Sequence, residues 1–593
     1  MVTVTPGVAF IFYHITVLVI PSVFFGLLLQ YSSDRMLGRY TLPTWFVTLA
    51  STLFLPLVST IRMIYKNLDD RRQAAKLGAR LAPRIDGKYI GNIDVLATMR
   101  HLRDTGYIAD GFVDWVGGDS VVNIPILWSD MILTVWPEHL KTMLATDFTN
   151  YAKIICPPEI DASTGKKFQD EMFHRSMTRP FFTRDRIRDF DIFDRHANTV
   201  LNLIKERMRS GNAMDFQDLM SRFTLDSASE FLFGIGVHSL AAGIPYPHNA
   251  TSVPSNSVTS QAKHANEFAA AFLQVQEVIA RRFLHGSIWP LMEIFEDKTK
   301  KSMEIVRAYL DPIIKEAVVK NANNAKNVLK GEGTESYVDE GETLIDHLVR
   351  LSSDPVVLRD ETLNIMIAGR DTTASTLTFI IYCLAMYPTV HARLREEVLD
   401  QVGPTKRPDF DDIKDMKYLR AVINETLRLF PTVPFNTREN IKATIWPSHD
   451  PAQKSIYIPA GTQLIYSVFI MHRRKDLWGP DADEFDPDRF LDDRLKRYLK
   501  NSFIFLPFNA GPRICLGQQF AYNEISFMLI RFIQQFTSVS LDEAASPPQA
   551  KPPAHWAEGV GRKTIERVYP KWHLTMYAQG GLWVRMTGAD PTA

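Results

Sequence analysis

One short segment near the C-terminus constrains this chain more than any other: Phe508-Asn-Ala-Gly511-Pro-Arg513-Ile-Cys515-Leu-Gly517. A lone cysteine is usually a small buried hydrophobic residue. Cys515, however, directly precedes an apolar stretch of helical character, residues 518–532, and the amide groups at a helix N-terminus stabilise a thiolate. The two glycines allow the backbone to approach a flat macrocycle closely. The pattern therefore predicts a thiolate ligand beside a planar cofactor.

This segment resembles the heme-binding signature of the cytochrome P-450 superfamily, Phe-x-x-Gly-x-Arg-x-Cys-x-Gly, at all five fixed positions. The resemblance implies that Cys515 is the axial ligand of the iron in heme b (iron protoporphyrin IX). Gly511 and Gly517 then approach the cofactor, Arg513 pairs with a heme carboxylate, and Phe508 shields the sulfur. It also implies a fold that is mainly α with small β-sheets, over roughly residues 82–584.

A second segment supports this interpretation. Residues 360–386 are expected to form one long helix that ends at Tyr387-Pro388, since the residue before a proline resists helical geometry. Inside it, Ala368-Gly-Arg-Asp371-Thr372-Thr resembles the distal-helix motif of the family. Small residues at Ala368 and Gly369 would open a groove for dioxygen and substrate beside the cofactor. The resemblance makes Thr372 a donor toward the iron-bound oxygen and Asp371 a proton relay. Without Cys515, a kinked helix with an exposed ion pair would explain the segment equally well.

A third segment holds Glu425 and Arg428, three residues apart on a predicted helix before Pro431. Such pairs are usually solvated and contribute a few tenths of a kcal/mol. Here the pair precedes Phe485-Asp-Pro-Asp-Arg489-Phe, in the order that the family shows. By resemblance, Glu425, Arg428 and Arg489 form a buried structural network that holds the thiolate loop.

Two further arginines are candidates for contacts with the heme propionates. Arg438 follows residues 434–437, where the family commonly places such an arginine. Arg175 lies in a stretch that resembles the propionate-contacting helix, but the chain has Glu171 where the family usually has tryptophan, and residues 157–169 lack the expected motif. Either the Arg175 contact is lost or the deduced sequence departs from the true one at a splice boundary.

The N-terminal region predicts a membrane anchor. Residues 7–29 contain no Asp, Glu, Lys or Arg and exceed the roughly 20 residues that cross a bilayer. A signal peptide fits poorly, because no Lys or Arg precedes the run. A second apolar run, residues 41–61, contains Pro43 and Pro56, so it is expected either as a weakened helix or as a segment along the interface. Basic residues then follow, which marks the cytoplasmic side: Arg62, Lys66, Arg71, Arg72, Lys76 and Arg80.

These features predict two domains: residues 1–81 as an anchor with one or two transmembrane helices and a basic linker, and residues 82–593 as a cytosolic heme-thiolate catalytic domain at the endoplasmic reticulum. The formal net charge is +0 and the pI is about 7.3, so nothing indicates a nucleic-acid partner. The three cysteines form no CxxC pair, which argues against a disulfide framework or a zinc site. Because no dinucleotide or flavin motif is apparent, electrons from NADPH must arrive through a separate flavoprotein reductase.

The expected activity is monooxygenation: one atom of O2 enters a C–H bond of a lipophilic substrate, which is an alkane, a fatty acid or an aromatic xenobiotic. Residues 368–373 and 508–521 most resemble fungal microsomal enzymes that hydroxylate alkanes and fatty acids. Two alternatives stay open. One is the same fold with non-oxygenase heme chemistry, whose members often lose the distal threonine that is present here as Thr372. The other is a membrane protein that binds heme and a ligand without turnover, against which the Asp371-Thr372 pair argues.

Overall fold

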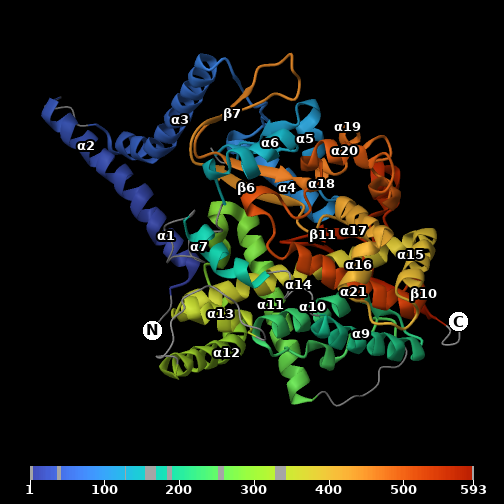
Figure 1. The fold of residues 1–593 in the computed structure, drawn as a ribbon. Coiled ribbons are helices and arrows are strands. Elements are labelled where there is room, and N and C mark those ends of the chain that lie inside the picture. The colour runs from blue at the N-terminus through green and yellow to red at the C-terminus, as the bar shows by residue number, and fades with distance from the viewer. Residues whose placement is uncertain are drawn as a thin grey trace.

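A computed structural model describes residues 4–36, 42–126, 129–153, 169–182, 190–250, 259–327 and 342–589. Helices make up most of this part of the chain and small sheets lie at its edges, so the predicted fold class is confirmed (Figure 1). Cys156 and most of the unusual stretch 157–169 lie outside the described residues. Figure 1 also shows that the N-terminal helices project from one side of the body.

The projecting part consists of two long apolar helical runs. The first contains α1 (Pro6–His14), a π-helical turn (Ile15–Val19) and α2 (Ile20–Met36), and the second is α3 (Thr44–Lys76). Both are long and apolar enough to cross a membrane. Pro56 was expected to weaken the second run, yet α3 continues through it. Membrane helices tolerate proline because neighbouring side chains and local adjustments satisfy the freed backbone groups.

Helix α14 (Pro355–Met386) runs through the centre of the body. It begins five residues before the predicted helix, because Pro355 occupies its first turn and the Asp354 side chain accepts from the Val356 amide at 2.8 Å. It ends before Pro388, as predicted. From Thr373 to Leu384 every residue of α14 is buried, so this half of the helix forms core on all sides.

The helices around α14 supply the remaining core. Helix α10 packs along it, and α17 and α21 contact it as well. The described helices of the body with eight or more residues are α4 (Ile93–Thr105), α7 (Gln169–Thr178), α9 (Asp191–Arg209), α10 (Phe216–Phe233), α11 (Ser260–His285), α12 (Lys300–Asn327), α13 (Leu344–Leu351), α14, α15 (Pro388–Gln401), α17 (Lys417–Leu429) and α21 (Gln518–Gln535). Shorter helices are α5 (Phe112–Val116), α6 (Pro137–Lys141), α16 (Phe410–Asp415), α18 (Val468–Met471), α19 (Lys475–Trp478) and α20 (Leu495–Lys500).

Four small sheets complete the described fold. The largest has the order β2 (Val121–Asn123), β3 (Met131–Thr134), β9 (Gln463–Ser467), β6 (Phe435–Asn440) and β4 (Tyr151–Ala152). A second joins β1 (Arg80–Leu81), β8 (Ile456–Ile458) and β7 (Thr444–Trp446). A third joins β10 (Phe536–Leu541), β13 (Trp583–Gly588) and β5 (Met214–Asp215), and β11 (Pro570–Trp572) pairs with β12 (Met576–Ala578).

Candidate active site

Cys515 lies in a short loop directly before α21, as the sequence predicted. Its amide donates to the Phe508 carbonyl at 3.0 Å, which closes the loop on itself. The Cys515 side chain is exposed, whereas Arg513 beside it is buried. The protein around the loop withdraws water from the thiol and raises the pKa of Cys515, while the Gly517 amide and the charge of Arg175 favour the thiolate. A ligating cation in contact with this sulfur would favour the thiolate further.

The structure gives Gly511 a role in addition to the expected approach to the cofactor. Its φ is +64°, and a Cβ atom added there would lie 2.0 Å from the carbonyl oxygen of Leu144. Gly511 is therefore required by a left-handed backbone and by close contact with the π-helical turn Thr142–Thr146. At Gly517, by contrast, an added Cβ would meet only Phe182, at 3.7 Å. Of these two glycines, the first shapes the loop itself.

One face of α14 is open where the sequence places its small residues. Ala368 is exposed, and Gly369 and Thr372 are partly exposed, although the next half of the helix is fully buried. A Cβ atom at Gly369 would come no closer than 3.7 Å to its nearest neighbour, Ala228. The small residues therefore leave α14 partly exposed at this level.

The two predicted proton-transfer residues have distinct surroundings. Thr372 Oγ1 donates to the Ala368 carbonyl at 2.6 Å, so in this state its proton points back along the helix, while the oxygen keeps its acceptor lone pairs. Asp371 is buried, and its Oδ1 lies 3.3 Å from Nη1 of Arg370. Its other oxygen, Oδ2, has no hydrogen-bond partner among the described residues. Asp371 therefore retains an acceptor that can bind water or a proton.

Glu524 is a buried acid that the sequence analysis missed. It lies on α21, and the Ser227 and Thr373 side chains lie beside it, so it joins α10, α14 and α21. Burial raises the pKa of Glu524 to about 8, and the two hydroxyl groups only partly offset this rise. A carboxyl group inside the apolar stretch 518–532 is the signal that would have revealed it.

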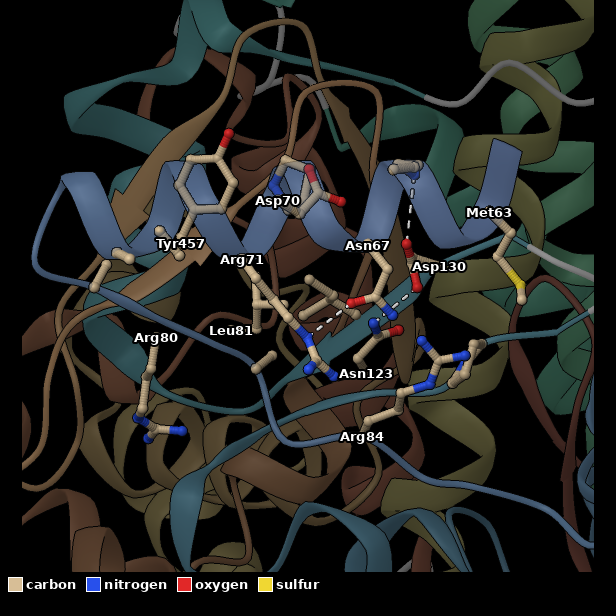
Figure 2. Close-up of a pocket in the computed structure, with 18 of the residues that line it drawn as sticks. Met63, Asn67, Asp70, Arg71, Arg80, Leu81, Arg84, Asn123, Asp130 and Tyr457 are labelled. Atoms are coloured by element: carbon tan, nitrogen blue, oxygen red, sulfur yellow. Dashed lines mark hydrogen bonds and ion pairs between the residues drawn. The ribbon is translucent and has the colours of Figure 1, made fainter. Parts of the chain in front are cut away.

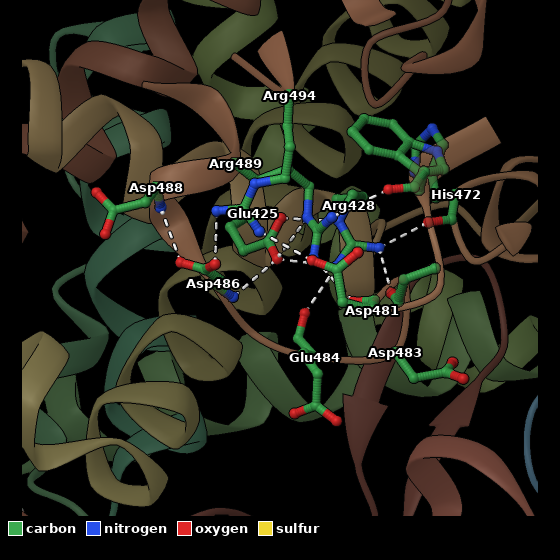
Figure 3. A network of polar contacts seen from close by, with 12 residues as sticks. Glu425, Arg428, His472, Asp481, Asp483, Glu484, Asp486, Asp488, Arg489 and Arg494 are labelled. Atoms are coloured by element: carbon green, nitrogen blue, oxygen red, sulfur yellow. Dashed lines mark hydrogen bonds and ion pairs between the residues drawn. The ribbon is translucent and has the colours of Figure 1, made fainter. Parts of the chain in front are cut away.

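Glu425, Arg428 and Arg489 form the buried network that the sequence predicted (Figure 3). Arg428 binds Glu425 in a bidentate manner, with Nε–Oε2 and Nη2–Oε1 distances of 2.7 and 2.8 Å. Arg489 Nε lies 3.4 Å from the same carboxylate, and the Asp486 amide donates to it at 2.9 Å. Removal of one partner from such a buried pair leaves an uncompensated charge and costs about 3–5 kcal/mol.

His472 connects this network to the cysteine loop, a link that the sequence did not reveal. Arg428 Nη1 donates to the His472 carbonyl at 2.8 Å, and His472 Nε2 accepts from the Leu506 amide at 3.0 Å. Burial and the charge of Arg428 lower the pKa of His472 to about 3, so its ring is neutral and can accept this bond. Leu506 stands two residues before Phe508, where the loop begins.

Two of the three predicted propionate arginines converge on Tyr466 in β9. Arg438 and Arg513 are both buried, and the positive charge of each opposes the rise that burial causes in the pKa of Tyr466. The Tyr466 hydroxyl donates to Asn509 in the cysteine loop. Arg438 Nε has no hydrogen-bond partner among the described residues, whereas Arg513 Nη1 donates to the Phe148 carbonyl at 3.0 Å. Arg175 donates to the carbonyl of Ile514.

These features fit a heme. The exposed cysteine side chain can ligate the iron, the open face of α14 leaves room on the distal side, and the buried guanidinium of Arg438 has a spare donor for a carboxylate. Arg175 acts on the sulfur itself: its charge partly offsets the rise that burial causes in the pKa of Cys515.

Comparison with known proteins agrees with this geometry. Residues 151–563 match the family model described as cytochrome P450. Cytochrome P450 52-M1 of Starmerella bombicola is 36% identical over 430 residues, which cover 69% of this chain and 76% of the relative. Cytochrome P450 52A6 of Candida tropicalis is 32% identical over 571 residues, 92% of this chain and 98% of the relative. Cytochrome P450 monooxygenase himC of Aspergillus japonicus is 34% identical over 466 residues, 77% and 74% of the two chains.

Proposed function

Because this chain belongs to the cytochrome P450 family, and is therefore a heme-thiolate monooxygenase with heme b as its cofactor, we propose that it hydroxylates alkanes or fatty acids with Cys515 as the axial ligand. The observation that carries the proposal is the exposed Cys515 side chain at the N-terminus of α21, together with the open face of α14 at Ala368. The resemblance of residues 368–373 and 508–521 to fungal alkane and fatty-acid hydroxylases supports the substrate class.

Several residues of the chain hold and shield the cofactor in this proposal. Cys515 supplies the thiolate, and Arg438 and Arg513 pair with the two carboxylates from the sheet side. Gly517, and the α14 face at Ala368 and Gly369, leave the space that a flat group needs. Phe508 lies over the loop and contacts the Tyr522 ring at 5.0 Å between centroids, which helps to exclude water from the sulfur. When bound, the heme supplies the activation of dioxygen and the insertion of oxygen into a C–H bond.

Thr372 and Asp371 move protons in this proposal. Thr372 Oγ1 accepts from a water in the groove while it donates to the Ala368 carbonyl, and rotation of the hydroxyl turns its proton toward the groove. Asp371 Oδ2 accepts a proton and passes it on, while Arg370 holds Oδ1 in place. Proton delivery at this point favours cleavage of the O–O bond over loss of reduced oxygen.

The same proposal includes the cellular setting. Residues 1–81 anchor the chain through two membrane-spanning helices and a basic linker, and residues 82–593 form the catalytic domain on the cytosolic face of the endoplasmic reticulum. An NADPH-dependent flavoprotein reductase supplies the electrons. A lipophilic substrate then enters from the membrane that holds the anchor.

Replacement of Thr372 tests the proposed chemistry. The full-length protein with its reductase, NADPH and a panel of alkanes and fatty acids is assayed for NADPH consumption and for hydroxylated product. Thr372→Ala is expected to lower product per NADPH at least about tenfold, because general acid–base groups contribute about 100-fold or more. Thr378→Ala is the matched control, since Thr378 makes the same bond to the carbonyl four residues earlier but lies in the buried half of α14.

The outcome separates the alternatives. Unchanged coupling in Thr372→Ala would contradict the role of Thr372, and an equal loss in Thr378→Ala would assign the effect to helix packing. Product formation without NADPH would indicate non-oxygenase heme chemistry. If the wild-type protein consumed no NADPH with any member of the panel, a ligand-binding role would be favoured instead.

A further inference from the structure

The longest helix of the anchor does not end at the membrane. Residues 44–61 of α3 carry no charged side chain, whereas residues 62–76 continue the same helix for about 22 Å at about 1.5 Å per residue. This polar half lies against the catalytic domain. Ala74 is buried with Ala79 and Tyr457, and Lys66 Nζ lies 3.4 Å from Oδ2 of Asp130. The polar half of α3 therefore contacts the body at both of these places.

A cavity of about 780 Å³ lies between this polar half of α3 and the sheet that contains β1 and β8 (Figure 2). Its lining includes Thr60 and Met63, at the point where the apolar part of α3 ends. If α3 spans the membrane, this end of the cavity lies at the level of the lipid head groups. The lining also includes apolar side chains, among them Met63, Leu81 and Tyr457.

The lining of the cavity is basic. It contains five cationic and two anionic side chains: Lys66, Arg71, Arg80, Arg84, Lys454, Asp70 and Asp130. Three of the cations already form ion pairs with carboxylates: Lys66 with Asp130, Arg80 with Asp119 and Arg84 with Asp86.

Arg71 and Lys454 remain. Arg71 Nε donates to Asn67 Oδ1 at 3.0 Å, and no carboxylate in the described part of the chain pairs with Arg71 or Lys454. Figure 2 shows Arg71 extending from α3 toward the segments that carry Asn123 and Arg84. Because a guanidinium and an ammonium group suit phosphate oxygens, these two residues are the cationic groups of the lining that are left for a phosphate.

We propose that this cavity binds one acidic glycerophospholipid of the surrounding bilayer, with the phosphate at Arg71 and Lys454 and the glycerol and first acyl carbons against apolar side chains of the lining. A lipid is favoured over a soluble phosphate because the lining reaches Thr60 and Met63, where the apolar segment of α3 ends, and because it contains apolar residues as well as basic ones. The bound lipid would fix the angle between α3 and the catalytic domain. This inference rests on the membrane topology proposed above.

Native mass spectrometry of the full-length heme-loaded protein tests the inference, with dioleoyl phosphatidylserine as the acidic lipid and dioleoyl phosphatidylcholine as the neutral one. The wild type is expected to bind one phosphatidylserine saturably. The double variant R71Q/K454Q should bind it at least about fivefold more weakly than the matched control R72Q/K76Q, since each basic residue at an anionic surface contributes about fivefold. Arg72 and Lys76 are exposed on the same helix but do not line the cavity.

Several results would overturn the inference. Equal weakening in both double variants would mean diffuse surface attraction, and equal binding of phosphatidylcholine would exclude selection for an acidic lipid. Displacement by glycerol 3-phosphate would assign the cavity to a soluble phosphate. Carbonate extraction of membranes tests the topology separately: a protein released by carbonate contradicts the proposed anchor, whereas a retained protein without saturable lipid binding contradicts only the cavity.

Discussion

At the scale of single residues, the buried acid Glu524 makes the sharpest prediction. The pKa of Glu524 is about 8 in the folded protein and near 4.5 when it is exposed, so the folded state holds a proton that the unfolded chain releases between these values. Stability should therefore fall as pH rises through this window, by at most about 1.4 kcal/mol per pH unit. Glu524→Gln, which is neutral at every pH, should remove this part of the slope.

Chemical unfolding of both proteins, followed by circular dichroism between about pH 5 and about pH 8, measures this difference. The variant should gain relative stability toward high pH. An identical pH slope in the two proteins would show that Glu524 is ionised in the folded state, and the assignment of its pKa would then be wrong.

The sequence predicted those site residues whose chemistry is carried by a local pattern. Glu425, Arg428 and Arg489 were found because their spacing and order are characteristic, and the structure places all three in one buried network. His472 was missed, because its role comes from a contact between the network and the Leu506 amide that no local pattern encodes. Arg438 and Arg513 were predicted singly, but their convergence on Tyr466 depends on how the sheet meets the cysteine loop.

At the scale of elements, the loop before α21 depends on Gly511. Gly511→Ala is expected to destabilise the protein by more than about 2 kcal/mol and to lower heme retention, because the new Cβ would lie 2.0 Å from the Leu144 carbonyl oxygen. Gly461→Ala is the matched control. Its φ is +68°, close to the +64° of Gly511, but an added Cβ meets nothing within 4 Å, so only about 1 kcal/mol of backbone strain is expected.

Thermal unfolding and the heme content of the purified proteins measure both effects. If the two variants lose stability equally, the contact with Leu144 is unimportant and backbone conformation alone explains the need for glycine at position 511.

Element boundaries show where local sequence reasoning reaches its limit. The end of α14 was predicted correctly because Pro388 acts locally, but its start was placed late because the cap formed by Asp354 and Pro355 was not recognised. Pro56 was weighed as a helix breaker by the rules of soluble helices. In α3 the helix continues through it, which is typical of membrane helices.

At the scale of the whole molecule, the two proposed spans would place the N-terminus and the catalytic domain on the same side of the membrane. Thr5 near the N-terminus donates to the Ile294 carbonyl at 2.6 Å, and an added Cβ at Gly7 would lie 2.5 Å from the Ile294 Cα atom, so the start of α1 packs directly on the body. An N-terminal epitope should therefore be digested by protease in sealed microsomes without detergent. An epitope inserted at residues 37–41 should be protected. If the N-terminal epitope were instead protected from the protease, a single span would be indicated.

The central claim is that Cys515 supplies a thiolate ligand to heme iron, and the absorption spectrum of the reduced, carbon-monoxide-bound protein tests it most directly. The wild-type protein should show a Soret band at the red-shifted position that thiolate ligation produces, and Cys515→Ser should lose this band while its circular dichroism shows a folded protein. A wild-type band at the position of histidine or neutral thiol ligation, or an unchanged red-shifted band in Cys515→Ser, would contradict the account.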